Sequence, residues 1–330
     1  MTLPALELCI APYDLPAFLE RWWEREPLFI SRRESNRFDR LMTRSTFDDL
    51  VAHTNLRVPF FRLLKDGKLV PESACTTSHQ LGPNTDVGLA DLNAVYNGYD
   101  DGAVVVLAAL EKIHPALTQF CSELEALFRC SVQAHACLAP PGAGALPLRY
   151  ETHGVFVLQV EGAKRWQLWS DRWRSPNDDE AAARSVDGDA PTMEFLLEPG
   201  DSLYLPGDFV HATAASSASS LHLAVEAKVL RWLDVIDVAV EQALASLTTD
   251  HEAQRALDFG RRPGEPIGTE DDAALAALGA RLVAGLDADR LVALARSWSE
   301  PPQSRDRSGA LLRRLADDAA ASMDCRREQA

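Results

Sequence analysis

Residues 149–166 read RYETHGVFVLQVEGAKRW, and this stretch carries the prediction of the fold. The mostly apolar run 155–160, the turn residue Gly162 and the segment after it predict two β-strands joined by a tight turn. Short segments of the same kind, separated by Pro and Gly, lie at 131–142, 195–213 and 219–229. Many short strands between such turns are typical of an antiparallel barrel or jelly roll.

Helical patterns flank the predicted barrel. Apolar residues recur at three- and four-residue steps over 103–129, which predicts a helix, and a short helix is expected over 14–25. We therefore expect a barrel with N-terminal helical and strand elements over 1–226 and a helical region over 227–330. The amphipathic helices of the second region could form a homodimer interface, or they could equally cover the barrel.

Composition limits the classes of partner. The chain has 330 residues and a formal net charge of −16, which argues against nucleic-acid binding because the phosphate backbone would be repelled. The longest apolar run, AVVVLAAL at 103–110, is too short to span a bilayer, and the N-terminal residues are a poor signal peptide. Six cysteines without CxxC spacing are typical of reduced thiols. A cytoplasmic protein that does not act at a membrane is expected.

Several strings in the chain resemble the Jumonji-C-like cupin proteins of the bacterial ribosomal-oxygenase type. They are APPG (139–142), THGVFVLQVEGAKRW (152–166), PGDSLYLPGDFVHAT (199–213) and SLHLAV (220–225), with WWEREPLFIS (22–31) as the entry segment. The resemblance implies a mostly β core with α additions: a double-stranded β-helix with N-terminal helices and a helical C-terminal region. It also implies a dioxygenase dependent on Fe(II) and 2-oxoglutarate that hydroxylates a peptide or protein side chain.

The resemblance also assigns the site. Non-haem iron oxygenases hold the metal with two imidazoles and one carboxylate, and residues two apart on a strand point to the same side. By the resemblance, His211 is the distal histidine, Arg149 stands in the place of the first histidine, and Glu151 stands in the place of the aspartate. Lys164 matches the basic residue that holds the distal carboxylate of 2-oxoglutarate, where a fixed cation is required. No catalytic residue is assigned.

Arg149 disturbs this assignment. A guanidinium stays protonated in proteins, so it has no lone pair for iron, and it would place a positive charge beside the cation. Glu151 keeps the carboxylate but is one methylene longer than aspartate. Only His211 and a longer carboxylate then remain of the three ligands.

Other histidines offer a replacement ligand. His153 shares a strand face with Glu151 by strand parity, and His135 would allow a rearranged site of His135, Glu151 and His211. The alternative is that His135 is a hydrogen-bonded core histidine. His222 is expected to be a structural residue that faces inward.

Two functions remain open from the sequence. In the first, the chain is an oxygenase with His211 and Glu151 as metal ligands, an irregular third ligand (His135 or His153) and Lys164 on the cosubstrate. In the second, it is an inactive binding protein for a peptide or an anion, with Arg149 in place of the metal and clamping the anion together with Lys164. Arg149 and Glu151 could also form a purely structural ion pair. A third hypothesis, different metal chemistry through His135 and Cys137, is less favoured.

Overall fold

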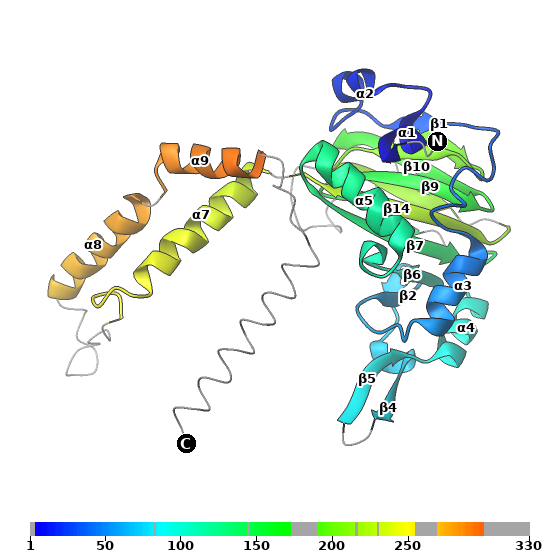
Figure 1. Cartoon of the computed structure of the whole chain (residues 1–330), viewed down its shortest axis with the longest axis horizontal. Coiled ribbons are helices and arrows are strands. Elements are labelled where there is room, and N and C mark those ends of the chain that lie inside the picture. The colour runs from blue at the N-terminus through cyan, green and yellow to red at the C-terminus, as the bar shows by residue number, and fades with distance from the viewer. Residues whose placement is uncertain are drawn as a thin grey trace. The chain divides into compact units, whose positions relative to one another are not determined.

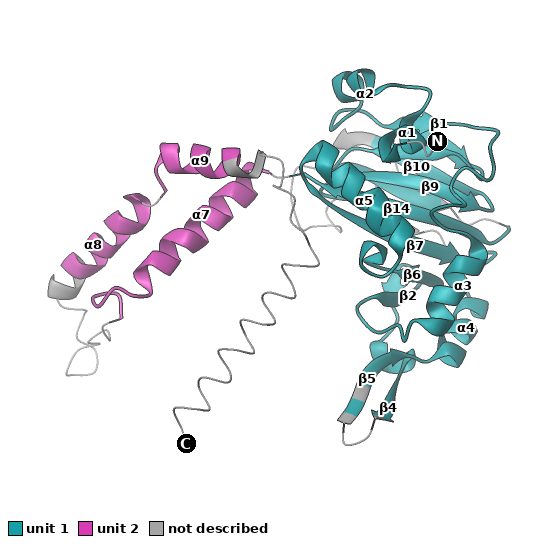
Figure 2. Ribbon diagram, in the orientation of Figure 1, with its two compact units in different colours: residues 1–230 teal, residues 231–330 magenta. Residues whose placement is uncertain are grey.

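The computed structural model describes residues 4–81, 84–143, 146–172, 190–214, 217–229, 231–254, 269–284 and 286–299. The chain divides into two compact units, residues 1–230 and residues 231–330, shown in teal and magenta in Figure 2. The first unit contains all the described strands, and the second is helical where it is described.

Two antiparallel sheets form the core of the first unit (Figure 1). The larger sheet has the strand order β1-β12-β9-β14-β7-β6-β2-β3, and the smaller has the order β11-β10-β13-β8. The larger sheet consists of β1 (Leu28–Ile30), β2 (Phe61–Lys65), β3 (Lys68–Leu69), β6 (Val104–Leu107), β7 (Ser131–Ala139), β9 (Gly154–Glu161), β12 (Ser202–Leu205) and β14 (Ser220–Lys228). The smaller consists of β8 (Leu146–Arg149), β10 (Lys164–Arg172), β11 (Met193–Leu197) and β13 (Phe209–Ala214). The predicted mostly β core with added helices is confirmed.

Strand β9 explains why the decisive stretch is apolar at almost every position. It lies between β12 and β14 in the larger sheet, and every residue from Gly154 to Val160 is buried. Phe156 and Leu158 belong to the main core cluster, whereas Val155 and Val157 pack with Trp166 in a second cluster. Since both faces of β9 are covered, the strand reads as a continuous apolar run rather than an alternating one.

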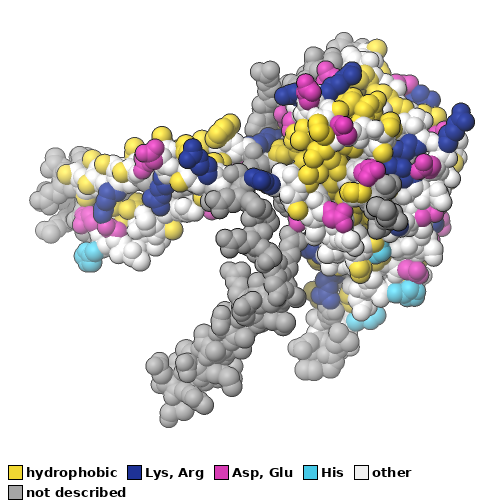
Figure 3. All heavy atoms as spheres, turned by 45° about the horizontal axis from the view of Figure 1, so that its top comes forward, with side chains coloured by type: hydrophobic (Ala, Val, Ile, Leu, Met, Phe, Trp, Pro, Cys, Tyr) yellow, Lys and Arg dark blue, Asp and Glu magenta, His cyan; other side chains and the backbone are white. Residues whose placement is uncertain are grey.

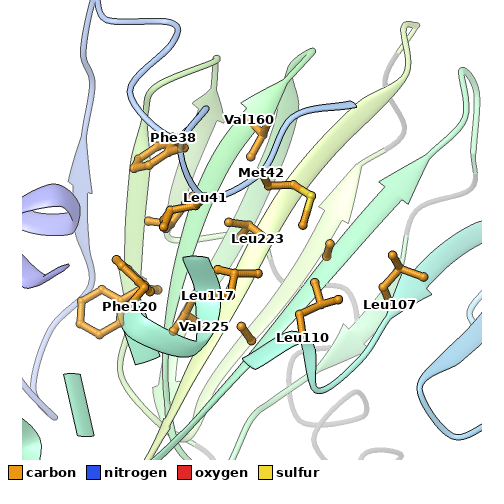
Figure 4. Close-up of a cluster of buried hydrophobic side chains, with 14 of the residues drawn as sticks. Phe38, Leu41, Met42, Leu107, Leu110, Leu117, Phe120, Val160, Leu223 and Val225 are labelled. Carbon is orange, nitrogen blue, oxygen red and sulfur yellow. The ribbon is translucent and has the colours of Figure 1, made fainter. Parts of the chain in front are cut away.

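Helices and a small hairpin complete the first unit. They are α1 (Ala5–Ile10), α2 (Leu15–Arg21), α3 (Arg44–His53), the hairpin β4 (Thr76–Leu81) with β5 (Asn84–Ala90), α4 (Leu92–Asp100) and α5 (Pro115–Phe128), with 3₁₀ turns at Glu72–Ala74 and Leu110–Lys112. Figure 4 shows Leu117 and Phe120 of α5 beside Leu223 and Val225 of β14. Helix α5 therefore covers the larger sheet with its apolar side.

The helix predicted over 103–129 is wrong in its first part. Val104–Leu107 form β6, which pairs with β2 on one side and β7 on the other, and all four residues are buried. A run of three valines favours a strand, because β-branched side chains pack well on a pleated surface. The helix itself begins at Pro115, a favourable residue for the first helical turn.

The second unit contains three described helices, α7 (Trp232–Leu247), α8 (Thr269–Ala284) and α9 (Ala288–Ser299). Helix α7 exposes large apolar side chains, among them Trp232, Leu233 and Ile236, and hydrophobic side chains are visible on this unit in Figure 3. The homodimer stays a prediction. Among the helices that the structure describes, none is long and apolar enough to cross a membrane.

Candidate functional site

A pocket lies where the two sheets of the first unit face each other. The larger sheet contributes His135 from β7 and His222 from β14, and the smaller sheet contributes Arg149, Trp166 and His211 from β8, β10 and β13. The cavity among these side chains has a volume of about 60 Å³. It can hold a few water molecules or one small polar group of a ligand.

His211 lies on the inner side of β13, and both of its ring nitrogens have a hydrogen-bond partner. Its Nδ1 is 3.0 Å from the Phe209 carbonyl oxygen, which only accepts, so Nδ1 carries the proton. The unprotonated Nε2 then accepts a hydrogen bond from Arg149 Nε at 3.3 Å. The lone pair of His211 that faces the pocket is therefore directed at a guanidinium.

Arg149 lies directly across from His211, because β8 and β13 pair with these two residues opposite each other. Its Nη2 is 3.5 Å from Glu151 Oε1, which makes a loose ion pair at the pocket rim. The structure thus brings together three residues that the sequence singled out, Arg149, Glu151 and His211. The strand β8 ends at Arg149, however, so Glu151 lies in the connection to β9 rather than on a strand.

The environment of His211 keeps its imidazole neutral. Burial, followed by the Arg149 cation, lowers the pKa of His211 from 6.5 to about 3, against the opposing effect of the Phe209 carbonyl. Burial also lowers the pKa of His222 well below 6.5, and the cations Lys164 and Arg149 act in the same direction. Both imidazoles are therefore neutral near pH 7.

His135 and His153 do not join His211 and Glu151. His135 Nε2 lies 3.3 Å from Glu226 Oε1, and His153 Nε2 lies 3.1 Å from Glu226 Oε2. The parity argument for His153 is wrong because β8 and β9 are separate strands, so side-chain alternation does not run from Arg149 to His153. Within the described part of the chain neither histidine forms a hydrogen bond or ion pair with Glu151, and their use as metal ligands stays a prediction.

Glu226 is a pocket residue that the sequence analysis missed. Burial alone would raise the pKa of Glu226, but hydrogen bonds with His135 and His153 outweigh it and hold the pKa well below 4.5. The signal was present: Glu226 stands four residues after His222 on β14, so the two share a strand face. An inward His222 therefore implies an inward Glu226.

Lys164 begins β10 and is 5% exposed. Burial lowers its pKa from 10.5 to about 8, with a further lowering by the Arg149 cation and an opposing effect of Cys137. Burial also raises the pKa of the Cys137 thiol, which keeps it protonated. The predicted cation is therefore inside the barrel, close enough to Arg149 and Cys137 to interact with them electrostatically.

The donor set does not fit a metal ion of the kind that the family resemblance implies. Among the residues that the structure describes, no group of three His, Cys, Asp or Glu side chains could hold a metal. The reason is local: a guanidinium occupies the place of one imidazole and takes the Nε2 lone pair of the other. The carboxylate of Glu226 contacts His135 and His153 instead.

Comparison with known proteins identifies the domain. Residues 108–235 match the family model of the JmjC domain. The chain is therefore similar to JmjC-domain proteins of the ribosomal-oxygenase type. The bifunctional lysine-specific demethylase and histidyl-hydroxylase NO66 of Drosophila mojavensis is 29% identical over 226 residues, which are 66% of this chain and 24% of that protein. Ribosomal oxygenase 1 of Rattus norvegicus is 27% identical over 259 residues, 76% of this chain and 42% of that protein.

These relatives are much longer than the part that matches. The chain spans about a quarter to two-fifths of their lengths. The JmjC fold is also that of YcfD, a ribosomal oxygenase of Escherichia coli whose structure holds cobalt and succinic acid. That structure aligns with a TM-score of 0.50 and 16% identity, covering 89% of this chain and 73% of YcfD. The resemblance found in the sequence is confirmed for family and fold.

The neutral imidazoles make the stability of the JmjC domain depend on pH. In the unfolded chain His211 binds a proton below about pH 6.5, whereas folded His211 binds one only near pH 3. The unfolded state therefore binds more protons between these values, and the stability of the fold falls as the pH falls from 6.5 to 3. Each such histidine contributes up to about 1.4 kcal/mol per pH unit. We expect the unfolding free energy in urea to decrease from pH 6.5 to 4.5, and to decrease less steeply in His211→Gln. An equal slope in the variant would contradict a neutral, buried His211.

Proposed function

We propose that this chain is a 2-oxoglutarate/Fe(II) oxygenase-like protein whose barrel pocket receives a peptide or protein side chain. The single observation that carries the proposal is the JmjC match over residues 108–235, which includes His135, Arg149 and His211 of the pocket. Relatives named as a histidyl-hydroxylase and a ribosomal oxygenase support a protein side chain as the target. JmjC proteins of this type generally depend on Fe(II) and 2-oxoglutarate, which supply the oxidising chemistry in those enzymes.

No chemical step through iron is assigned to this chain. The described residues offer one imidazole in the expected place, and its lone pair already accepts from Arg149. Lys164 is retained and buried, which supports a carboxylate as one ligand of the pocket. The residues therefore support recognition of the family's ligands better than they support metal chemistry.

A second candidate function is favoured by the contact between Arg149 and His211. A guanidinium in the place of a metal turns the pocket into a cationic binding site, so the chain would be a cupin-fold binding protein for a peptide or an anion without redox chemistry. Fold alone does not separate the two candidates, because the same fold hosts unrelated functions.

One assay separates them. The full chain is loaded anaerobically with Fe(II), supplied with 2-oxoglutarate and oxygen, and assayed for succinate, with His211→Ala as the control. Succinate that depends on iron and is lost in His211→Ala establishes the oxygenase candidate. Succinate absent from the native chain but formed by the double variant Arg149→His, Glu151→Asp establishes the binding candidate, because it locates the block at the changed positions.

A further inference from the structure

Two buried donors in the pocket have no hydrogen-bond partner among the residues that the structure describes. Trp166 Nε1 and His222 Nδ1 are both buried in side chains that are 3% exposed, and both side chains line the cavity. The two rings lie edge to face, with centroids 5.7 Å apart. An indole N–H can only donate, and His222 Nδ1 donates in one neutral tautomer. Buried donors without partners are costly, so groups of this kind mark a place where a ligand acceptor belongs.

Two arginines, Arg62 and Arg149, and two glutamates, Glu151 and Glu226, line the pocket, and the buried Lys164 adds a further cation inside the barrel. Glu226 is bound by His135 and His153, and Glu151 is the only carboxylate in contact with Arg149 among the described residues. Lys164 has no hydrogen bond or ion pair within the part of the chain that the structure describes, although it is almost fully buried. A buried cation without an anion is costly, so the pocket favours a negatively charged ligand.

The guanidinium of Arg149 has room for such a ligand. It carries five N–H donors, of which Nε is directed at His211 and Nη2 is in loose contact with Glu151. The ring centroids of His211 and Trp166 are 5.8 Å apart. Arg149 and the two donors without partners line the same small cavity. A planar fork of donors is suited to a carboxylate, which can accept two hydrogen bonds from it.

We propose that the pocket binds a carboxylate without any metal ion, with Arg149 on the carboxylate and with Trp166 and His222 as further donors. The proposal deepens the second candidate function and rests on it, because it names the chemistry of the anion. A carboxylate reaches the pocket from one of two sources, a small organic acid or an acidic side chain of a peptide. Lys164 supplies the second positive charge of the barrel interior and favours a ligand with more than one negative charge.

The test is calorimetric titration of the full native chain in buffer with EDTA. Succinate is the organic-acid probe, and N-acetyl-glutamate amide is the side-chain probe. We expect metal-free binding of at least one of them, and the tighter of the two identifies the source. Arg149→Gln should weaken binding by at least about tenfold, since it removes a charge-assisted contact. Trp166→Phe keeps an aromatic ring, removes the indole N–H donor and should weaken binding about fivefold.

Arg165→Gln is the matched control. Arg165 follows Lys164 on β10 but lies on the outer side, where its side chain is 48% exposed and contacts Glu194 at 2.7 Å. Its loss should change the affinity by less than about twofold. Absence of binding in EDTA would overturn the proposal, as would binding that survives both pocket substitutions. If Arg149→Gln fails to fold, the native chain and Trp166→Phe still decide.

The same titrations keep this proposal separate from the oxygenase candidate. Succinate binding that appears only after a divalent metal is added overturns metal-free recognition and leaves the oxygenase candidate standing. Binding in EDTA by a chain that forms no succinate from 2-oxoglutarate supports the proposal and removes the oxygenase reaction.

Discussion

Gly162→Ala is expected to lower the free energy of unfolding by about 3–5 kcal/mol. Gly162 forms the turn between β9 and β10 with φ of +63°, a conformation that residues other than glycine adopt only at a cost. A Cβ at this position would also lie 1.9 Å from the Ser219 carbonyl oxygen. Ser219 lies just before β14, which pairs with β9, so the clash is with backbone that the barrel holds in place. Urea denaturation of the full chain measures the loss.

Gly102→Ala separates the two causes of this loss. Gly102 also has a positive φ, +95°, but a Cβ there meets no atom within 4 Å. It should therefore cost only the backbone strain, about 1–2 kcal/mol. Equal losses in the two variants would show that the contact with Ser219 contributes nothing to the loss in Gly162→Ala, and that backbone strain alone explains it.

The turn at Gly162 illustrates what the sequence could predict. The two strands and the turn between them follow one another within a few residues. The strand preferences of the residues and the run of mostly apolar side chains were therefore enough to predict β9 and β10. The strand β6 was missed for the opposite reason. Val104–Leu107 become a strand through pairing with β2 and β7, which are distant in sequence, and the helical spacing of the residues that follow extended the predicted helix over them.

The residues of the site could be predicted from the sequence better than the contacts between them. Arg149 and His211, which the resemblance assigned to the site, both line the pocket, because they lie opposite each other on paired strands. The resemblance could not place His153, since the connection between β8 and β9 breaks the alternation on which the parity argument rested. Glu226 was missed although its spacing from His222 on β14 places both on one strand face, because its two histidine partners come from strand β7 and from the residue before β9, which are distant in sequence.

The double substitution Arg149→His, Glu151→Asp is expected to create a site that binds Co²⁺ at least about 100-fold more tightly than the native chain does. Arg149 is directly opposite His211 across β8 and β13. The Cβ atoms of such a cross-strand pair are about 5 Å apart, so two imidazoles at these positions can reach one ion. The first change also releases the His211 Nε2 lone pair from the guanidinium. The shorter carboxylate at position 151 then completes a set of two imidazoles and one carboxylate.

The visible absorption of Co²⁺ and its calorimetric affinity report this gain without any need for turnover. Glu151→Asp alone should leave the affinity close to that of the native chain, because Arg149 still occupies the ligand place. Arg165→His adds an imidazole on the outer side of β10, so it controls for non-specific metal binding. A native chain that binds Co²⁺ as tightly as the double variant would show that Arg149 moves aside, and would return His135 and His153 to consideration as ligands. A double variant without the gain would show that the loss of the metal site extends beyond these two positions.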